Sequence, residues 1–460
     1  MECVPYPHGM EDLPEIGHRA TVLVNTHQGE TRHEGRVLPP AAPRHLTLKL
    51  DNGYNVSVRH EDVVSVEDHG RVEPTTTASG ETATPDAGLP RVRIVHTGGT
   101  IASKVDYASG AVVARSEPEE LIASIPELAQ LAALDAVKVG NMFSDDIRPQ
   151  HWNLMAEAVA AAFEDGCRGV VIAHGTDTLH YTSAALNFIF GGQGDRLPGP
   201  IVLVGSQRSS DRGSTDATEN LLAAVHWAAR GPTPTGHAGD NAVVVMHEGQ
   251  SDGTLSVHSG LGVRKLHSSR RDAFQPVNAE PLATVALSPG GPEHRLSPDY
   301  EAVQGAANPR PVATKVHGFE PGQRIGHFVA GPWLHGEHVE AVIASGVQGL
   351  VIHGTGLGHL PIEDAMGDAP ENTVLWRTLT RCMNRQLPVV VVNQCIHGPV
   401  DMNVYAKGRQ QRSLGVLGHG MNATPEAISV KLHWVLSQAM DVAEAMEKNL
   451  CGEHRENLRR

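Results

Sequence analysis

Two threonine-bearing turns are the stretches of this sequence best suited to chemistry. The first, TGGT at 97–100, follows a predicted strand of alternating β-branched residues at 92–95, and the second, GTDT at 175–178, follows the apolar run 170–173. Paired glycines allow a tight turn just past a strand, which presents Thr100 at the carboxyl edge of a sheet. Open α/β folds bind their ligands at that edge. A threonine held there, with its restricted χ1 angle, suits the role of a positioned nucleophile.

A plainer interpretation stays open for the first turn. Glycine-rich turns after strands are common, and Thr100 is then only a residue near the start of a helix. Two parallel strands that both end in such turns, however, bring Thr100 and Thr176 to one edge of a sheet, with Asp177 beside them. The two turns together therefore favour a catalytic site.

A third stretch, GVRKLHSSRRDAF at 262–274, contributes a lysine. By itself, Lys265 is most simply a residue of a solvated basic loop. Hydrolysis of a carboxamide needs a hydroxyl nucleophile, a group that accepts its proton and donors for the developing oxyanion. A desolvated lysine can become neutral and act as the base, with an aspartate to orient it. Thr176, Asp177 and Lys265 are the candidates for such a proton relay.

The composition limits the other functions. The chain has 460 residues and a formal net charge of -15, which disfavours direct binding of nucleic acid because phosphate contacts need clustered Lys and Arg. No apolar run reaches the ~18 residues of a membrane span, and no signal segment is evident, so we expect a cytoplasmic protein. The five cysteines stand far apart and the 27 histidines form no HExxH spacing, so we expect no metal site.

The pattern of apolar runs and turn signals predicts an α/β protein preceded by a small all-β module. Short alternating strands and an Asn-Gly turn at 52–53 predict an SH3-like barrel at 13–70, followed by a Thr- and Pro-rich linker at 71–90. From residue 91, strands alternate with helices, which predicts a parallel sheet covered on both faces. We expect an N-terminal α/β domain at 91–308 and a C-terminal α/β domain at 309–450.

Individual elements of the α/β part follow from the same patterns. The predicted strands are 92–95, 170–173, 201–204, 242–246, 349–352 and 389–392. The predicted helices are 117–125, 151–164, 178–190, 216–229 and a single amphipathic helix at 424–446, with Thr424 as its N-cap and Pro425 at its first position. Residues 231–241, rich in Gly and Pro, are predicted to be a surface loop.

The motifs TGGTIAS and HGTDT, in this order, resemble those of the asparaginase/glutaminase family of amidohydrolases. The resemblance implies an asparaginase-like two-domain parallel-sheet fold, with Thr100 as the nucleophile that forms an acyl-enzyme. It also implies a relay of Thr176, Asp177 and Lys265, because a lysine follows the VVVM strand in that family as Lys265 follows AVVVMHEG here. The expected substrate contacts are Gly99, Tyr107 and Gly175 on the loops of these two motifs, and Ser206 after the predicted strand 201–204.

Further stretches of the sequence restrict the resemblance to one group of proteins within this family. With the N-terminal module, the segments GSQRSSDRGSTDATENL, SSRRDAF, HGTGLGHLP and DMNVYAKGR resemble the D subunits of archaeal-type glutamyl-tRNA(Gln) amidotransferases. That family implies a glutaminase subunit that supplies ammonia. A separate E subunit binds Glu-tRNA(Gln) and uses ATP and Mg²⁺ to convert it to Gln-tRNA(Gln). The resemblance implies no cofactor in this chain and a homodimer of it within a heterotetramer.

Two other hypotheses stay open. A free-standing cytoplasmic L-asparaginase shares the same four catalytic candidates and needs no partner. A non-catalytic scaffold that docks tRNA or a partner through the barrel is disfavoured by the intact Thr100, Thr176, Asp177 and Lys265. The preference between glutamine and asparagine is also open, because one methylene group is worth only about 1–3 kcal/mol in a binding pocket.

Overall fold

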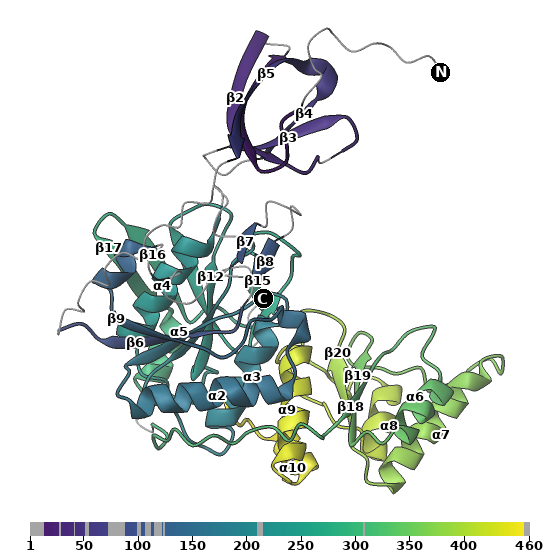
Figure 1. Cartoon of the computed structure of the whole chain (residues 1–460). Helices are drawn as coiled ribbons and strands as arrows, with labels where there is room; N and C mark the ends of the chain where they lie inside the picture. Colours follow the sequence, from purple (N-terminus) through teal and green to yellow (C-terminus); the bar gives the residue numbers. More distant parts are fainter. Residues whose placement is uncertain are drawn as a thin grey trace, which may run out of the picture.

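The computed structural model shows a small β-structured part, a large α/β part and a smaller α/β part in chain order (Figure 1). The residues that it describes are 13–26, 29–40, 42–50, 55–71, 88–98, 103–105, 112–114, 122, 125–208, 215–306 and 309–454. The predicted Asn-Gly turn and most of the predicted helix 117–125 lie outside them. Within the described part, no helix is long and apolar enough to cross a membrane.

The first part is an antiparallel sheet in the order β4-β3-β2-β1-β5. Alternate residues of β1, among them Ala20, Val22 and Val24, are buried and form a small core with Val37 and Leu48. The prediction of a small all-β module is confirmed. Its elements are β1 (His18–Thr26), β2 (Gly29–Leu38), β3 (His45–Leu50), β4 (Asn55–Arg59), the 3₁₀ turn η1 (His60–Asp62) and β5 (Val63–Arg71).

An eight-stranded sheet forms the centre of the large α/β part. Five strands are parallel, in the order β9-β6-β10-β11-β12. The sequence analysis predicted a parallel sheet and four of these strands, but it missed β9. The five strands are β6 (Arg91–His96), β9 (Ala133–Lys138), β10 (Gly169–Ala173), β11 (Ile201–Val204) and β12 (Ala242–His247).

The other three strands of this sheet are antiparallel, which the sequence analysis did not predict. They are β13 (Thr254–Ser259), β16 (Ala283–Ser288) and β17 (Gly291–Leu296). The connections from β12 to β13 and from β16 to β17 are short, whereas a parallel pair needs a crossover of about a dozen residues or more.

Helices cover both faces of the large sheet, and the strand side chains alternate between them. Val170 and Ile172 of β10 pack with α2 (Pro149–Glu164) and α3 (Leu179–Gly191), whereas Val171 and Ala173 pack with α4 (Ala217–Arg230) on the other face. A strand buried on both faces reads as a continuous apolar run, which is why its position was predictable.

The smaller α/β part has a parallel sheet in the order β18-β19-β20. Its strands are β18 (Ile325–Val329), β19 (Gly349–Gly354) and β20 (Val389–Asn393), and its helices are α6 (Gly336–Ala344), α7 (Pro370–Asn384) and α8 (Ala406–Leu414). The remaining elements are β7 (Ser103–Val105), β8 (Val112–Ala114), η3 (Pro126–Gln130), η4 (Ser144–Asp146), β14 (Val263–Lys265), β15 (Phe274–Pro276), α5 (Pro298–Gln304), α9 (Pro425–Ser437) and α10 (Val442–Glu447).

The predicted helix 424–446 is wrong as a single element, although its start is confirmed. Thr424 caps α9, because its Oγ1 accepts a hydrogen bond of 3.2 Å from the backbone N–H of Ala427. The chain then breaks at Ala439, whose φ of 52° lies in the left-handed region, and Asp441 caps the separate helix α10. An alanine gives no signal for such a break, since left-handed residues are usually Gly or Asn.

The predicted surface loop 231–241 is also wrong in its exposure. Asp240 is 1% exposed and its carboxylate accepts hydrogen bonds from the backbone N–H and hydroxyl of Thr235, the N–H of Gly236 and the hydroxyl of Tyr300. A buried carboxylate with several donors holds the loop inside the fold, because an unpaired one would cost several kcal/mol.

A buried ion pair fixes the end of the described chain to α9. Lys431 Nζ lies 2.8 Å from Glu453 Oε1, and both side chains are fully buried. Burial favours the neutral acid, but Lys431 and the backbone N–H groups of Leu450 and Cys451 outweigh it and hold the pKa of Glu453 below its ordinary 4.5. The pair therefore stabilises the fold most when both groups are charged.

Glu453→Gln should lower the free energy of unfolding by about 3–5 kcal/mol at pH 7, because it leaves a buried lysine without its counter-ion. Since the folded-state pKa of Glu453 is lowered, the contribution of its charge is present above pH 4.5 and is lost as the pH falls below that value. Thermal unfolding of both proteins from pH 7 to pH 3.5 measures this. An equal difference in melting temperature at every pH would contradict the assignment.

Candidate active site

The two threonine-bearing turns leave neighbouring strands at the same edge of the large sheet. β6 and β10 are parallel, with His96 in register with Ala173. Beyond them, the backbone N–H and Oγ1 of Thr97 both donate to the carbonyl of Ala173, at 3.1 and 3.0 Å. The turns at 97–98 and 174–178 therefore start side by side, at the edge where open α/β folds bind ligands.

The TGGT turn needs its first glycine for two reasons. Gly98 has a φ of 108°, and a Cβ atom there would lie 2.6 Å from the backbone N and O of Met142. Only glycine accepts this backbone angle together with so close an approach. The chain then runs into Gly99 and Thr100, which lie outside the described residues, as does Tyr107. Their predicted roles as nucleophile and substrate contacts stay predictions.

Lys265 joins the second turn directly. Its Nζ atom lies 2.8 Å from Thr176 Oγ1 and 2.9 Å from Asp177 Oδ1. The side chain of Lys265 is 9% exposed and that of Asp177 is 68% exposed. The lysine is therefore nearly buried, whereas the carboxylate that pairs with it is accessible to solvent. The structure thus brings Lys265 together with two residues that lie 89 and 88 positions before it in the chain. Their catalytic roles stay predictions.

Ser144 of η4 accepts hydrogen bonds from the residues of this second turn. Its Oγ accepts a hydrogen bond of 3.1 Å from the N–H of Asp177, and its carbonyl accepts one of 2.5 Å from Thr178 Oγ1. A Cβ atom on Gly175 would lie 2.9 Å from the Ser144 Cβ, so the glycine permits the contact. Sequence reasoning missed Ser144, and it placed Gly175 as a substrate contact, which stays a prediction beside this structural role.

A buried histidine fixes the start of the turn. His174 is fully buried, and burial lowers its pKa to about 4, so the ring is neutral at pH 7. A proton on Nδ1 donates to the carbonyl of Gly175 at 2.6 Å, and Nε2 accepts from Thr182 Oγ1 at 2.9 Å. Trp152 Nε1–H in turn donates to Thr182 Oγ1 at 3.1 Å. These three residues, which the sequence analysis also missed, hold the turn without adding a charge.

Ser206 follows β11 on the other side of Thr176. Its hydroxyl donates to the carbonyl of Arg208 at 2.8 Å, and the preceding Gly205 leaves room for Thr176, whose Cγ2 would lie 2.8 Å from a Cβ atom there. The buried carboxylate of Asp216 accepts from the N–H groups of Gln207 and Arg208. Ser206 therefore lies in a braced turn beside the relay, and its contact with substrate stays a prediction.

Among the residues that the structure describes, one group of side chains has the geometry of a metal site. Glu219, His247 and Asp252 offer ligand atoms within 4.8 Å of one another. Both ring nitrogens of His247 have partners, however: Nδ1 lies 2.7 Å from Asn220 Oδ1 and Nε2 lies 2.9 Å from Glu219 Oε2. Asp252 pairs with Arg271. These contacts explain the cluster as a network between β12 and α4.

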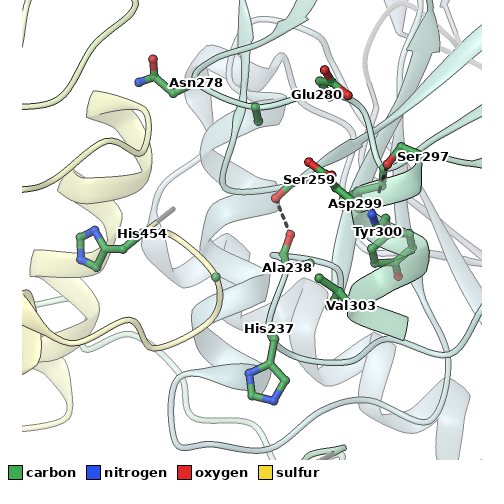
Figure 2. Close-up of a pocket in the computed structure, with 13 residues that line it drawn as sticks. His237, Ala238, Ser259, Asn278, Glu280, Ser297, Asp299, Tyr300, Val303 and His454 are labelled. Atoms are coloured by element: carbon green, nitrogen blue, oxygen red, sulfur yellow. Dashed lines mark hydrogen bonds between the residues drawn. The ribbon is translucent and has the colours of Figure 1, made fainter. Parts of the chain in front are cut away.

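A cavity of about 250 Å³ lies away from the relay (Figure 2). His237 and Ala238 precede β12, and Ser259 ends the antiparallel β13, so the cavity is at the amino edge of the parallel strands. Figure 2 shows Ser259 donating to the carbonyl of Ala238, at 2.7 Å. Since the relay lies at the opposite, carboxyl edge, this cavity is not the candidate active site.

Comparison with protein families identifies all three parts of the chain. Residues 91–293 match the N-terminal asparaginase family, residues 325–447 match the glutaminase/asparaginase C-terminal domain, and residues 20–67 match the GatD N-terminal domain. The L-asparaginases of Thermococcus kodakarensis and Vibrio cholerae each have 28% sequence identity to this chain and superpose with a TM-score of 0.63. They cover 80% of this chain and 100% and 99% of their own. The two α/β parts thus have the asparaginase-type amidohydrolase fold.

Full-length relatives define the family more narrowly. The D subunit of glutamyl-tRNA(Gln) amidotransferase from Methanobrevibacter smithii is 37% identical over 90% of this chain and 88% of its own length. The protein of the same name from Pyrococcus furiosus is 35% identical over 95% of this chain and 94% of its own length. The chain belongs to the family of glutamyl-tRNA(Gln) amidotransferase D subunits.

Lys265→Ala and Asp177→Asn should each lower kcat for glutamine hydrolysis about 10²–10⁴-fold, because each removes part of one proton relay. The double variant should be little slower than the slower single variant, since residues that act as a unit are non-additive. Steady-state kinetics of the four proteins measure this, with Lys448→Ala at the exposed end of α10 as a control. Losses that simply multiply would contradict a shared relay.

Proposed function

We propose that this chain is the glutaminase subunit of a tRNA-dependent amidotransferase. It hydrolyses glutamine to glutamate and ammonia, and a partner subunit uses the ammonia to convert Glu-tRNA(Gln) to Gln-tRNA(Gln). The observation that carries the proposal is the contact of Lys265 Nζ with Thr176 Oγ1 and Asp177 Oδ1 at the carboxyl edge of the sheet. The names of the full-length relatives support the same activity.

The proposed reaction has two halves. The Thr100 hydroxyl attacks the carboxamide carbon of glutamine, and its proton passes through the relay to a neutral Lys265. The tetrahedral intermediate collapses, the C–N bond breaks, and the leaving nitrogen takes that proton to depart as ammonia. Water then attacks the Thr100 ester with the same relay as base, which releases glutamate and restores the hydroxyl.

Asp177 is proposed to have two contacts at once. One oxygen, Oδ1, orients Lys265 at 2.9 Å. The side chain is 68% exposed, so the rest of the carboxylate is accessible to a ligand. An α-ammonium group of an amino-acid substrate is the cation that suits it. This arrangement selects a free amino acid, and it would make bound substrate cover the exposed end of the relay.

The partners are proposals that rest on the family. We propose that an E subunit binds Glu-tRNA(Gln) and uses ATP and Mg²⁺, while this chain carries no cofactor and forms a homodimer within a cytoplasmic heterotetramer. The net charge of -15 supports this division of labour, because an acidic chain is poorly suited to hold tRNA by itself. The relatives are named as one subunit of an amidotransferase, which also implies an assembly of several chains.

The two other hypotheses fit less well. The L-asparaginase structures cover their own chains almost completely but leave a fifth of this chain uncovered. That difference, together with the match of residues 20–67 to the GatD N-terminal domain, favours the amidotransferase subunit over a free-standing L-asparaginase. A non-catalytic scaffold would have no need of a sealed lysine within 3 Å of both Thr176 and Asp177, a geometry that carries an electrostatic cost.

The isolated chain should hydrolyse glutamine slowly, and addition of the E subunit with Glu-tRNA(Gln) should raise its rate, because uncoupled hydrolysis releases ammonia with no acceptor. Ammonia release is measured on the chain alone, with the E subunit, and with the E subunit and Glu-tRNA(Gln), using glutamine and asparagine in parallel. Lys265→Ala in the full mixture is the control for ammonia from other sources. Full turnover by the isolated chain, above all with asparagine, would contradict the proposed role as a subunit.

A further inference from the structure

Lys265 reaches the relay from a ribbon of two short strands that is separate from the large sheet. β14 pairs with β15 so that Lys265 lies opposite Phe274 and Val263 lies opposite Pro276. Each strand has only three residues. A two-stranded ribbon of this size is not stable by itself, so its position depends on the elements packed around it.

One side of the ribbon packs on α3, the helix that follows Thr176 and Asp177. The buried ring of Phe274 meets His180 edge-on, with ring centroids 6.4 Å apart. Burial lowers the pKa of His180 to about 3, with a further contribution from the charges of Arg264 and Lys265. His180 is therefore neutral at pH 7 and acts as an aromatic packing surface.

The other side of the ribbon is joined to α9 by a charged contact. Arg264, the neighbour of Lys265, places a terminal guanidinium nitrogen 2.9 Å from Glu426 Oε1. Glu426 stands in the first turn of α9, directly after Pro425, and its side chain is only 6% exposed. Burial raises its pKa, and the positive charge of Arg264 opposes that effect. Arg264 thus offsets part of the cost of burying this carboxylate.

Glu426 is only partly satisfied by this contact. Its second oxygen, Oε2, is buried and has no hydrogen-bond partner within the part of the chain that the structure describes. A buried carboxylate with one paired oxygen is unfavourable for stability alone, and a well-packed apolar residue would cost less. Glu426 therefore suits a role other than stabilising the fold.

A second contact joins the ribbon to the C-terminal α/β part, at the end that lies away from Lys265. Asn278, two residues beyond β15, donates from Nδ2 to the carbonyl of Asn422 at 2.9 Å and accepts at Oδ1 from the N–H of Gly398 at 2.8 Å. Its φ of 52° is a conformation that asparagine tolerates. The middle of β14, at Arg264, and the end of the ribbon beside Val263 and Pro276 are thus held by residues beyond position 390.

α9 lies between the two α/β parts and contacts both (Figure 1). Trp434 of α9 stacks on Phe188 of α3 with ring centroids 6.1 Å apart, and α9 also packs on β19 and β20. One helix therefore sets the position of α3, which follows Asp177, and of the ribbon, which carries Lys265.

We propose that Glu426 is a positioning residue for Lys265, and that α9 uses its ion pair with Arg264 to set the distance from Lys265 to Thr176 and Asp177. This inference rests on the proposed amidohydrolase function, because its test measures the rate of glutamine hydrolysis. A displacement of about 1 Å at a reacting group can cost about 10²-fold in rate. The C-terminal α/β part is then mechanically linked to the relay through a contact that touches neither substrate nor the reacting atoms.

Glu426→Gln tests this link, because it removes the charge and keeps the shape. We expect kcat for glutamine to fall about 10–100-fold, with KM changed less than about threefold, since Lys265 would be displaced while the substrate contacts remain. Arg264→Gln should give the same loss, and Arg264→Lys should retain more activity because an ammonium group can still pair with Glu426. If Glu426→Gln does not fold, the two Arg264 variants decide the question.

The matched control is Glu453→Gln, which breaks the other buried ion pair of α9, with Lys431. It should lower the melting temperature and leave kcat unchanged, which separates positioning from stability. Wild-type kcat in folded Glu426→Gln and Arg264→Gln, or a loss confined to KM, would overturn the proposal. Lys265→Ala is measured alongside: if it is inactive while Glu426→Gln is fully active, only the positioning role fails, and if it is fully active the proposed relay fails.

Discussion

The contact of Lys265 Nζ with Thr176 Oγ1 and Asp177 Oδ1 is the interaction on which the rest of the site depends. It joins two pieces of chain that are far apart in sequence: the turn after β10, and a short ribbon outside the main sheet. The lysine is nearly buried and its aspartate is largely exposed, so the charge of Lys265 is balanced from the solvent side. A bound substrate would exclude that solvent and strengthen each electrostatic contact.

The surroundings of this contact are built mainly from uncharged groups. Ser144 and His174 hold the turn through hydrogen bonds, and the low pKa of His174, about 4, keeps its ring neutral. The charged groups are one layer further out: Arg264, the neighbour of Lys265, forms an ion pair with Glu426 of α9. The proposed base therefore has neutral hydrogen-bonding groups beside the turn that it contacts, and the ion pair of Arg264 with Glu426 lies behind it.

Much of the fold was predictable because its central strands are buried on both faces and read as continuous apolar runs, as in β10 and β11. The turn with Thr176 and Asp177 was predictable because it follows such a strand directly. Ser144 and Glu426 were missed because only tertiary contacts bring them to the second turn and to the ribbon. His174 adjoins the turn in sequence, but its role depends on burial and on the hydrogen bonds that join it to Thr182 and Thr182 to Trp152, which no local pattern shows. The break at Ala439 and the burial of Asp240 were missed for a related reason: neither residue carries a local signal for what the surrounding fold imposes on it.

The central claim is that a threonine nucleophile and this relay hydrolyse a carboxamide. Its most direct measurement is covalent labelling with a glutamine analogue in which an electrophilic diazoketone replaces the carboxamide, followed by mass-spectrometric mapping of the adduct. We predict one adduct for each chain, on Thr100, and much slower labelling of Lys265→Ala because the relay no longer accepts the proton. An adduct on Thr176, or an active protein that the analogue never labels, would contradict the account.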